Sequence, residues 1–338
     1  MRPLFFVILL ISTAVPAFSQ SKHPFTFEEM MKLKRVGEPE VSPDGKWVIF
    51  SALDVDLAAN TRTPHIWIAP LAGGQGREII STQNATRPRW APDGKRFAFI
   101  SNKGGGSQVW IADFDGAAGT VTGLRQLTSI ATEAGGELWS PDGRNILFVS
   151  NVYPECPDEA CNVRKLEETA NSKVEAMIFT RLLYRQANAY KEGKHNHIFV
   201  IAADACSETA PPGCAGGAAR DLTPGDYEAP VFGLGTQDNY AFSPDGQEIC
   251  YSSNHDKNEA ASTNNDLWIV PITGGPARNI TAANAASDST PLYSPDGKYI
   301  AYLTQERPGY ESDRFCLTLY DRKTAEKKNL TEDFDRWV

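Results

Sequence analysis

Trp139-Ser-Pro-Asp-Gly143 is one of five copies of a short phrase that recurs along this chain. Each copy is followed directly by an apolar run, such as Ile146-Leu-Phe-Val149 after the third copy. Proline presets the backbone of a turn, aspartate can accept a hydrogen bond from an amide ahead of it, and glycine takes the left-handed position that closes the turn. The phrase therefore predicts a β-hairpin. The five copies begin at Val41, Trp90, Trp139, Phe242 and Tyr293.

Each hairpin is followed by two further predicted strands. The third strand of the second repeat is Val109-Trp-Ile111, and the fourth ends at Thr128 after a glycine-containing turn. Four short antiparallel strands in tandem repeats are typical of a β-propeller. We therefore predict an all-β fold with five four-stranded antiparallel blades and the start of a sixth. A sixth turn would fall just past Val338, so the sequence is expected to stop inside an incomplete propeller.

The spacing of the repeats locates an insertion in the third blade. The repeat prolines lie at 43, 92, 141, 244 and 295, so one interval is about twice the others. A second measure is the number of residues from the repeat proline to the Ser or Thr at the end of the fourth strand. This number is large only in the third repeat, which indicates about 45 extra residues between its second and third strands. We place this insertion at 152–196 and predict a helix over Leu166–Arg185. The insertion is either a loop that covers a propeller edge or a loop that takes part in binding at the mouth of the propeller.

The N-terminus has the pattern of a secretory signal over residues 1–19, with Arg2 before a short apolar core and Ala17-Phe-Ser19 as the cleavage site. The protein is therefore expected to be periplasmic or secreted, with an uncleaved anchor as the alternative. Residues 20–36 are predicted to form a strap whose helix, Pro24–Val36, has Thr26 as its N-cap. The propeller then spans 37–338.

Charge and cysteine content narrow the possible partners. The net charge of −9 argues against nucleic acid or an anionic membrane as a partner. In an exported protein, cysteines that are close in sequence predict local disulfides. We expect two such bonds and two buried thiols. The expected bonds join Cys156 to Cys161 and Cys206 to Cys214, and the expected thiols are Cys250 and Cys316.

The sequence shows no recognisable catalytic site. It has no Gly-x-Ser-x-Gly nucleophile motif, no phosphate loop and no dinucleotide-binding glycine motif. His195 and His197 could form half of a zinc site, but no third ligand is in view. We therefore predict no catalytic residue, no metal and no cofactor within this chain.

Several segments outside the repeats resemble one family. They are similar to the third-blade insertion and later loops of secreted bacterial dipeptidyl-peptidase V-like enzymes, which belong to the prolyl oligopeptidase family of serine peptidases. The segments are Val152-Tyr-Pro-Glu-Cys156, Thr180-Arg-Leu-Leu-Tyr-Arg185, Gly193-Lys-His-Asn-His-Ile-Phe-Val200, Ser262-Thr-Asn-Asn-Asp-Leu267 and Arg307-Pro-Gly-Tyr-Glu-Ser-Asp313.

This resemblance implies a propeller that restricts access to a C-terminal α/β-hydrolase domain, which would carry the Ser-Asp-His triad of an exopeptidase releasing dipeptides. The implied partners are that hydrolase domain and a peptide substrate. Candidates for the substrate-facing or interdomain side are Arg181, Arg185, Glu311 and Asp313. The alternative is a non-catalytic TolB-like periplasmic propeller that acts as a protein-binding scaffold.

Overall fold

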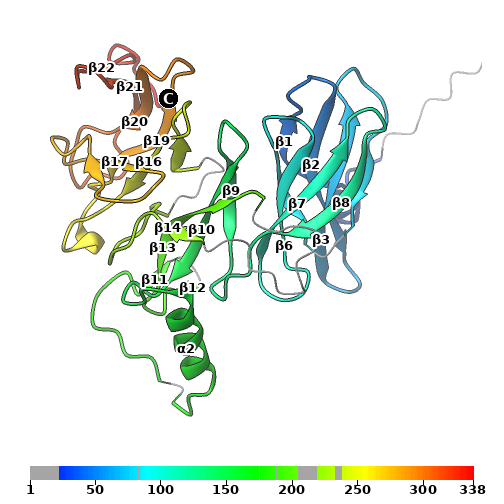
Figure 1. The fold of residues 1–338 in the computed structure, drawn as a ribbon, viewed down its shortest axis with the longest axis horizontal. Coiled ribbons are helices and arrows are strands. Elements are labelled where there is room, and N and C mark those ends of the chain that lie inside the picture. Colours follow the sequence, from blue (N-terminus) through cyan, green and yellow to red (C-terminus); the bar gives the residue numbers. More distant parts are fainter. Residues whose placement is uncertain (1–22, 82–83, 175, 187–188, 205–218, 233–237) are drawn as a thin grey trace, which may run out of the picture.

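A computed structural model describes residues 23–81, 84–174, 176–186, 189–204, 219–232 and 238–338. It contains five four-stranded antiparallel sheets, which confirms the predicted blades. Figure 1 shows the sheets following one another in chain order, from blade one in blue to blade five in orange and red. No helix in these residues is long and apolar enough to span a membrane.

Each blade pairs its strands in sequence order, apart from the insertion in blade three. Blade one is β1 (Arg35–Val41), β2 (Trp47–Asp56), β3 (Thr61–Pro70) and β4 (Arg77–Ile80), and blade two is β5 (Thr86–Trp90), β6 (Arg96–Ser101), β7 (Gln108–Asp115) and β8 (Thr120–Gln126). Blade three is β9 (Gly135–Trp139), β10 (Asn145–Val152), β13 (His195–Ala202) and β14 (Arg220–Asp221). Blade four is β15 (Tyr240–Phe242), β16 (Glu248–Ser253), β17 (Asp266–Pro271) and β18 (Arg278–Asn279). Blade five is β19 (Asp288–Tyr293), β20 (Tyr299–Thr304), β21 (Cys316–Asp321) and β22 (Lys327–Asn329).

The repeated phrase forms the hairpin turn between the first two strands of each blade. In the first copy, the Ser42 hydroxyl donates to Asp44 Oδ1 at 2.7 Å, and Asp44 Oδ1 accepts from the Lys46 amide at 3.1 Å. Gly45 has φ +69°, in the left-handed region that favours glycine. The hydrogen bond from Ser42 and the contacts with Lys46 lower the pKa of Asp44 to about 2.

Neighbouring blades pack through apolar side chains from their facing surfaces. Ile66 and Ile68 of blade one pack with Phe97 and Phe99 of blade two, all fully buried. Similar clusters lie between blades two and three, three and four, and four and five. The second and third strands of the middle blades are therefore buried on both faces, because a sheet covers each face.

In blades two to five, the fourth strand is followed by a threonine with a defined structural role. In blade four, Thr281 Oγ1 accepts from the amide of Leu267, the second residue of β17, at 2.9 Å. Thr128, Thr223 and Thr331 accept equivalent amides in their own blades. A buried amide without a partner is costly, so the hydroxyl satisfies a backbone group where the strand pairing ends.

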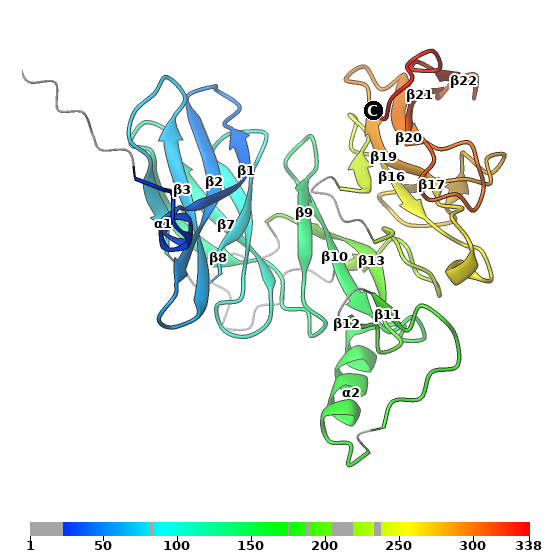
Figure 2. The same ribbon diagram turned by 180° about the vertical axis from the view of Figure 1, so that it is seen from behind.

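The N-terminal helix is shorter than expected. α1 spans Phe27–Lys32 and lies beside blade one (Figure 2). Thr26 is its N-cap, as expected, and forms a capping box with Glu29. The chain enters β1 at Arg35, so the expected extension of the helix to Val36 is wrong. The expected signal sequence lies outside the described residues.

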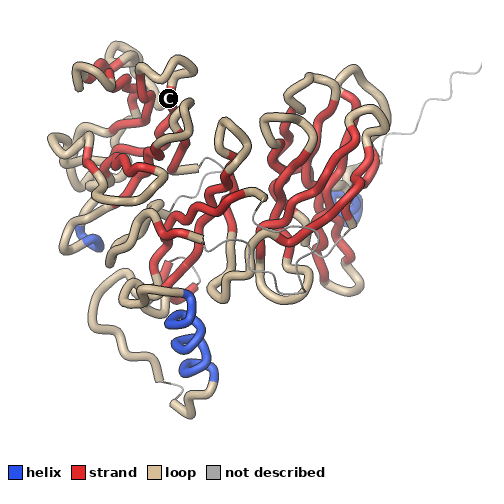
Figure 3. Tube along the Cα trace, in the orientation of Figure 1, coloured by secondary structure: helices blue, strands red, loops and turns tan. Residues whose placement is uncertain are grey.

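The insertion lies between β10 and β13, as predicted, but its helix is displaced toward the N-terminus. α2 spans Glu159–Ala170, capped by the Asp158 side chain, which accepts from the Cys161 amide. The predicted helix over Leu166–Arg185 is therefore wrong beyond Ala170. A loop and the short hairpin β11 (Arg185–Gln186) and β12 (Ala189–Tyr190) follow. Figure 3 shows α2, in blue, projecting from an otherwise strand-rich chain.

Residues 333–338, where the lead-in to a sixth blade was expected, form no strand. The Trp337 ring packs edge-on against Phe315, with ring centroids 5.5 Å apart. This segment therefore rests against blade five.

Candidate functional site

The strand order places the insertion at a defined end of the propeller. In an antiparallel blade, the turns between strands one and two and between strands three and four lie at one end. The loops between strands two and three lie at the other end, together with the crossings to the next blade. We call these the turn end and the insertion end. The insertion, the blade-four loop 254–265 and the blade-five loop 305–315 all lie at the insertion end.

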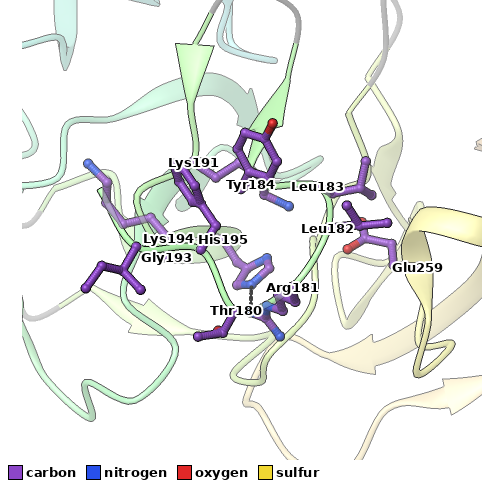
Figure 4. Close-up of a pocket in the computed structure, with 12 residues that line it drawn as sticks. Thr180, Arg181, Leu182, Leu183, Tyr184, Lys191, Gly193, Lys194, His195 and Glu259 are labelled. Carbon is purple, nitrogen blue, oxygen red and sulfur yellow. Dashed lines mark hydrogen bonds between the residues drawn. The ribbon is translucent and has the colours of Figure 1, made fainter. Parts of the chain in front are cut away.

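Arg181 connects the insertion to the crossing between blades three and four. Its Nη1 and Nη2 atoms donate to the two carboxylate oxygens of Asp226 at 2.8 and 2.6 Å. Its Nη2 also lies 2.9 Å from His195 Nε2, a contact drawn as a dashed line in Figure 4. Both partners of the ion pair are more than half exposed, with side-chain exposures of 57% and 59%. Arg181 therefore lies at the surface, above a layer of buried polar side chains.

The buried polar side chains beneath Arg181 form a network around Glu228. His195 Nδ1 and Lys191 Nζ both contact Glu228 Oε1, at 3.1 and 2.5 Å. The Asn196 amide donates to Glu228 Oε2 at 2.8 Å. Burial opposes ionisation of Glu228, but hydrogen bonds from His195 and Lys191 outweigh it, so its pKa is lowered. The network fixes the point where the insertion returns to β13, because each buried charge has a partner.

The two histidines do not form the metal site considered from the sequence. His197 Nδ1 lies 2.7 Å from Asp221 Oδ2, and its Nε2 lies 2.9 Å from the Gly225 carbonyl. The ring nitrogens of His195 are also in contact with protein atoms. Within the described part of the chain, no group of three His, Cys, Asp or Glu residues has metal-binding geometry.

Arg181 lines two pockets at the insertion end. The first, of about 120 Å³, is formed by residues 178–184 together with Lys191, His195 and Glu259 (Figure 4). The second, of about 330 Å³, is formed mainly by Asp226, Tyr227 and residues 254–260 of blade four. Neither pocket is lined by a serine or cysteine among the described residues. Both offer hydrogen-bonding and charged groups suited to a polar ligand.

His255 provides an aromatic wall in the second pocket. Its ring lies 3.7 Å from the Tyr227 ring and 4.0 Å from the Trp268 ring, measured between centroids. Burial lowers the pKa of His255 to about 4, so this imidazole is neutral at pH 7. The wall is therefore an uncharged stack beside charged groups.

The other three candidate residues are placed in different surroundings. Asp313 accepts the amides of Glu306 and Arg307 at 3.0 and 2.9 Å, so its carboxylate holds the blade-five loop together. Arg185 and Glu311 are exposed. Among the described residues, no hydrogen bond or ion pair joins either arginine candidate to Glu311 or Asp313. The structure brings none of these pairs into direct contact.

The cysteines agree with the sequence prediction where the structure describes them. Cys156 and Cys161 form a disulfide at the start of the insertion, immediately before and within the first turn of α2. Cys250 and Cys316 are buried free thiols. The predicted bond between Cys206 and Cys214 lies outside the described residues.

A second charged site, which was not predicted, lies where the first strands of the blades converge. The Arg87 guanidinium contacts Asp238 at 2.6 Å, Glu137 at 3.4 Å and Glu38 at 3.6 Å. These carboxylates come from blade four, blade three and blade one, so one side chain of blade two links four blades. Arg89 adds a contact of 3.2 Å with Glu38. We call Glu38, Arg87, Arg89, Glu137 and Asp238 the axial charge cluster.

Glu137 is the most unusual member of the axial charge cluster. Its side chain is fully buried, and neither carboxylate oxygen has a hydrogen-bond partner within the described structure. Burial raises the pKa of Glu137 to about 8, although Arg87 opposes the shift. Glu137 therefore holds a proton more readily than an ordinary carboxyl does.

The first strands of blades one, two, three and five share a backbone irregularity, and two instances of it lie in the axial charge cluster. Glu38, Arg87 and Thr290 have φ of +50°, +53° and +55°, and Gly136 has +66°. Each of the four lies five residues before its repeat proline, next to a shift in strand register. Such a bulge redirects a side chain. A sequence alignment of the repeats at this offset could have indicated the position, but not the partners.

Comparisons with known proteins relate the chain to peptidases. No model of a protein family matches the chain. Over 322 residues it is 32% identical to dipeptidyl-peptidase 5 of Porphyromonas gingivalis, covering 92% of this chain and 43% of that protein. It is 29% identical to dipeptidyl-peptidase 5 of Porphyromonas endodontalis, covering 94% of this chain and 45% of that protein. The chain belongs to the prolyl oligopeptidase family.

Solved structures show the same fold. The acylaminoacyl peptidase of Pyrococcus horikoshii matches with a TM-score of 0.63 and 19% identity, over 91% of this chain and 41% of that one. The β-propeller domain of the trilobed protease from Pyrococcus furiosus matches with a TM-score of 0.55 and 17% identity, over 91% and 73%. This prolyl oligopeptidase-family propeller thus spans less than half the length of the dipeptidyl-peptidase 5 relatives.

Proposed function

We propose that this chain is the substrate-gating propeller of an exported serine peptidase that releases dipeptides from peptide N-termini. The observation that carries the proposal is the similarity to dipeptidyl-peptidase 5, which extends over 92% of the chain. The catalytic serine, histidine and aspartate would come from an α/β-hydrolase domain, in the part of the protein that corresponds to the remaining length of the relatives. A TolB-like scaffold is not favoured, because that likeness is one of fold alone.

The propeller's contribution to such an enzyme is selection. Peptide hydrolysis by this chemistry requires an activated serine, a base and an oxyanion hole, and the lining of the two pockets that Arg181 shares contains no serine among the described residues. A barrier to large substrates changes which molecules reach a catalytic centre but does not itself stabilise the transition state. The two pockets provide polar and charged groups that could contact a peptide on its way.

Export is the second part of the proposal. The N-terminal pattern of residues 1–19 supports it, as does the Cys156–Cys161 disulfide, because such bonds persist in oxidising compartments. We expect the mature chain to begin near Gln20. The intact mass of protein recovered from the periplasm or medium tests this, and retention of Met1 would contradict it.

The activity is tested with the complete gene product in its mature form. Purified protein should release dipeptides from dipeptidyl arylamide substrates, and a serine-directed fluorophosphonate should abolish this release. A preparation lacking everything after residue 338 is the matched control and should be inactive. If the complete, folded protein released no dipeptides from a broad substrate panel, the proposed activity would be wrong.

A further inference from the structure

The insertion carries an unusual concentration of exposed apolar side chains. Six apolar side chains that are each at least 40% exposed lie within eleven residues, 174–184. Their exposed fractions are 70% for Val174, 54% for Met177, 86% for Ile178, 43% for Phe179, 69% for Leu182 and 40% for Tyr184. We call these six residues the insertion patch. Exposed apolar side chains gathered in this way mark a surface that contacts a protein partner, a membrane or a ligand.

Two sets of contacts hold residues 179–184 in place. Arg181 lies within it and is fixed by Asp226 and His195. The rings of Phe179, Tyr184 and Tyr190 stack on one another, with centroid separations of 4.2 Å and 5.7 Å from Phe179. Because the polar anchor takes up the side facing the blade, Ile178 and Leu182 on either side of it stay uncovered. Figure 4 shows Leu182 beside Glu259, away from the His195 contact.

We propose that the insertion patch is the docking surface for the rest of the same polypeptide, the part that corresponds to the unaligned length of the dipeptidyl-peptidase 5 relatives. More than half of each of those proteins lies outside the aligned region, since the alignments cover 43% and 45% of them. A tethered partner has a high effective concentration, so a small apolar surface is enough to hold it. This inference rests on the proposed function for the identity of the partner.

Docking on the insertion patch would also affect the first pocket. It adjoins the first pocket, whose lining includes Ile178, Phe179, Leu182 and Tyr184 together with His195 and Glu259. A body seated on the insertion patch would therefore cover or extend that pocket. The docking surface and the substrate-facing side would then be the same region of the propeller.

Site-specific photo-cross-linking in the complete protein tests the proposal. The photo-reactive amino acid p-benzoylphenylalanine replaces Ile178 in one variant and Leu182 in another. Leu71 is the matched control, because it is 49% exposed and lies at the turn end, directly after β3. Mass spectrometry then identifies the peptide joined to each position. We expect intramolecular links from 178 and 182 to residues beyond 338, with a yield several-fold above that from 71.

Three results would overturn the proposal: links that join two copies of the protein, links to lipid, or a yield at 178 and 182 no higher than at 71. The readout does not depend on catalysis. Links to residues beyond 338 in a protein without peptidase activity would keep the docking surface and reject the proposed function. An active peptidase without such links would do the reverse.

Discussion

Arg181 joins a loop to a blade through one exposed ion pair and one histidine contact. Exposed pairs contribute little to global stability, on the order of 0–1 kcal/mol. Removal of Arg181 should therefore loosen the insertion without unfolding the propeller. In the complete protein, Arg181→Ala should increase hydrogen exchange of the amides in 176–184 and leave the melting temperature nearly unchanged. Arg185→Ala is the control, and equal exchange in both variants would contradict an anchoring role.

Arg185 and Glu311 differ from Arg181 because the described structure gives their side chains no ion pair. Neither side chain is needed to hold its own loop, so a structural effect of removal should be small. If they face the substrate, Arg185→Ala or Glu311→Ala should change kcat/KM for peptides while the melting temperature stays constant. Asp313→Ala is the contrasting variant, because it removes acceptors for two loop amides and should lower stability. Unchanged kinetics in both single variants would leave Arg185 and Glu311 without a substrate role.

Glu137 gives a pH dependence whose direction follows from its surroundings. Burial raises its pKa to about 8 in the folded protein. As pH rises from the ordinary range of a carboxyl, the unfolded chain loses this proton first, so the folded state loses stability between about pH 4.5 and 8. The slope for one such group is at most about 1.4 kcal/mol per pH unit. Glu137→Gln should remove this part of the dependence.

Urea unfolding at pH 5.5 and 7.5 measures that effect. The fall in unfolding free energy between the two pH values should be smaller in Glu137→Gln than in the parent protein. Glu326→Gln, at an exposed position, should behave as the parent does. The same pH dependence in all three proteins would show that Glu137 is ionised at pH 7.

The axial charge cluster shows what the sequence could not provide at the scale of residues. Arg87 and Glu137 are 50 positions apart, and Asp238 lies much further along the chain. Their meeting depends on how the blades are arranged around a common centre, which no local pattern encodes. The network of His195 and Glu228 is similar, because Glu228 comes from the crossing to blade four. The histidine spacing alone was compatible with a metal site.

At the scale of elements, the hairpins were predictable because their cause is local. A turn's geometry is set by four adjacent residues, and its glycine must take positive φ. Gly143 has φ +69°, and an added Cβ would meet only ordinary contacts, so Gly143→Ala would suffer backbone strain alone. We expect a loss of about 1–2 kcal/mol in unfolding free energy. Gly116→Ala, at a turn position without positive φ, is the control and should change stability much less. Equal losses would contradict the turn argument.

The insertion helix was misplaced for a reason that is also physical. Val174, Ile178 and Leu182 recur at four-residue spacing, which favours an amphipathic helix. In the structure these side chains are exposed, so no packing within this chain rewards a helix there. α2 instead starts where Asp158 caps it and the Cys156–Cys161 disulfide constrains its first turn. The regularly spaced apolar residues therefore lie on the surface and not in a core.

At the scale of the whole molecule, the five blades form a continuous scaffold whose two kinds of loop lie at opposite ends. The repeats predicted this architecture because each blade repeats the same local pattern. They could not predict which end has a function, since that depends on loops unique to single blades. The insertion, the two pockets and the insertion patch all lie at one end. Selection of substrates is therefore expected to operate from the insertion end.

Selection by size is the prediction that belongs to this scale. If the propeller gates a peptidase, the complete enzyme should act on short peptides and not on the same N-terminal sequence displayed by a folded protein. Two substrates separate these cases: a free decapeptide, and the same ten residues fused without a flexible linker to a small, thermostable domain. The decapeptide should be shortened by dipeptides, and the fusion should be cut far more slowly, because its bulk cannot pass the propeller.

A heat-unfolded or denatured form of the same fusion partner controls for sequence effects. Once that domain is unfolded and kept soluble, cleavage of the fusion should approach the rate for the decapeptide. If the folded fusion were trimmed as fast as the free decapeptide, the propeller would not restrict access, although the dipeptide-releasing activity would stand. That result would leave the proposed docking as the role of the insertion end, because docking on the insertion patch does not depend on the exclusion of large substrates.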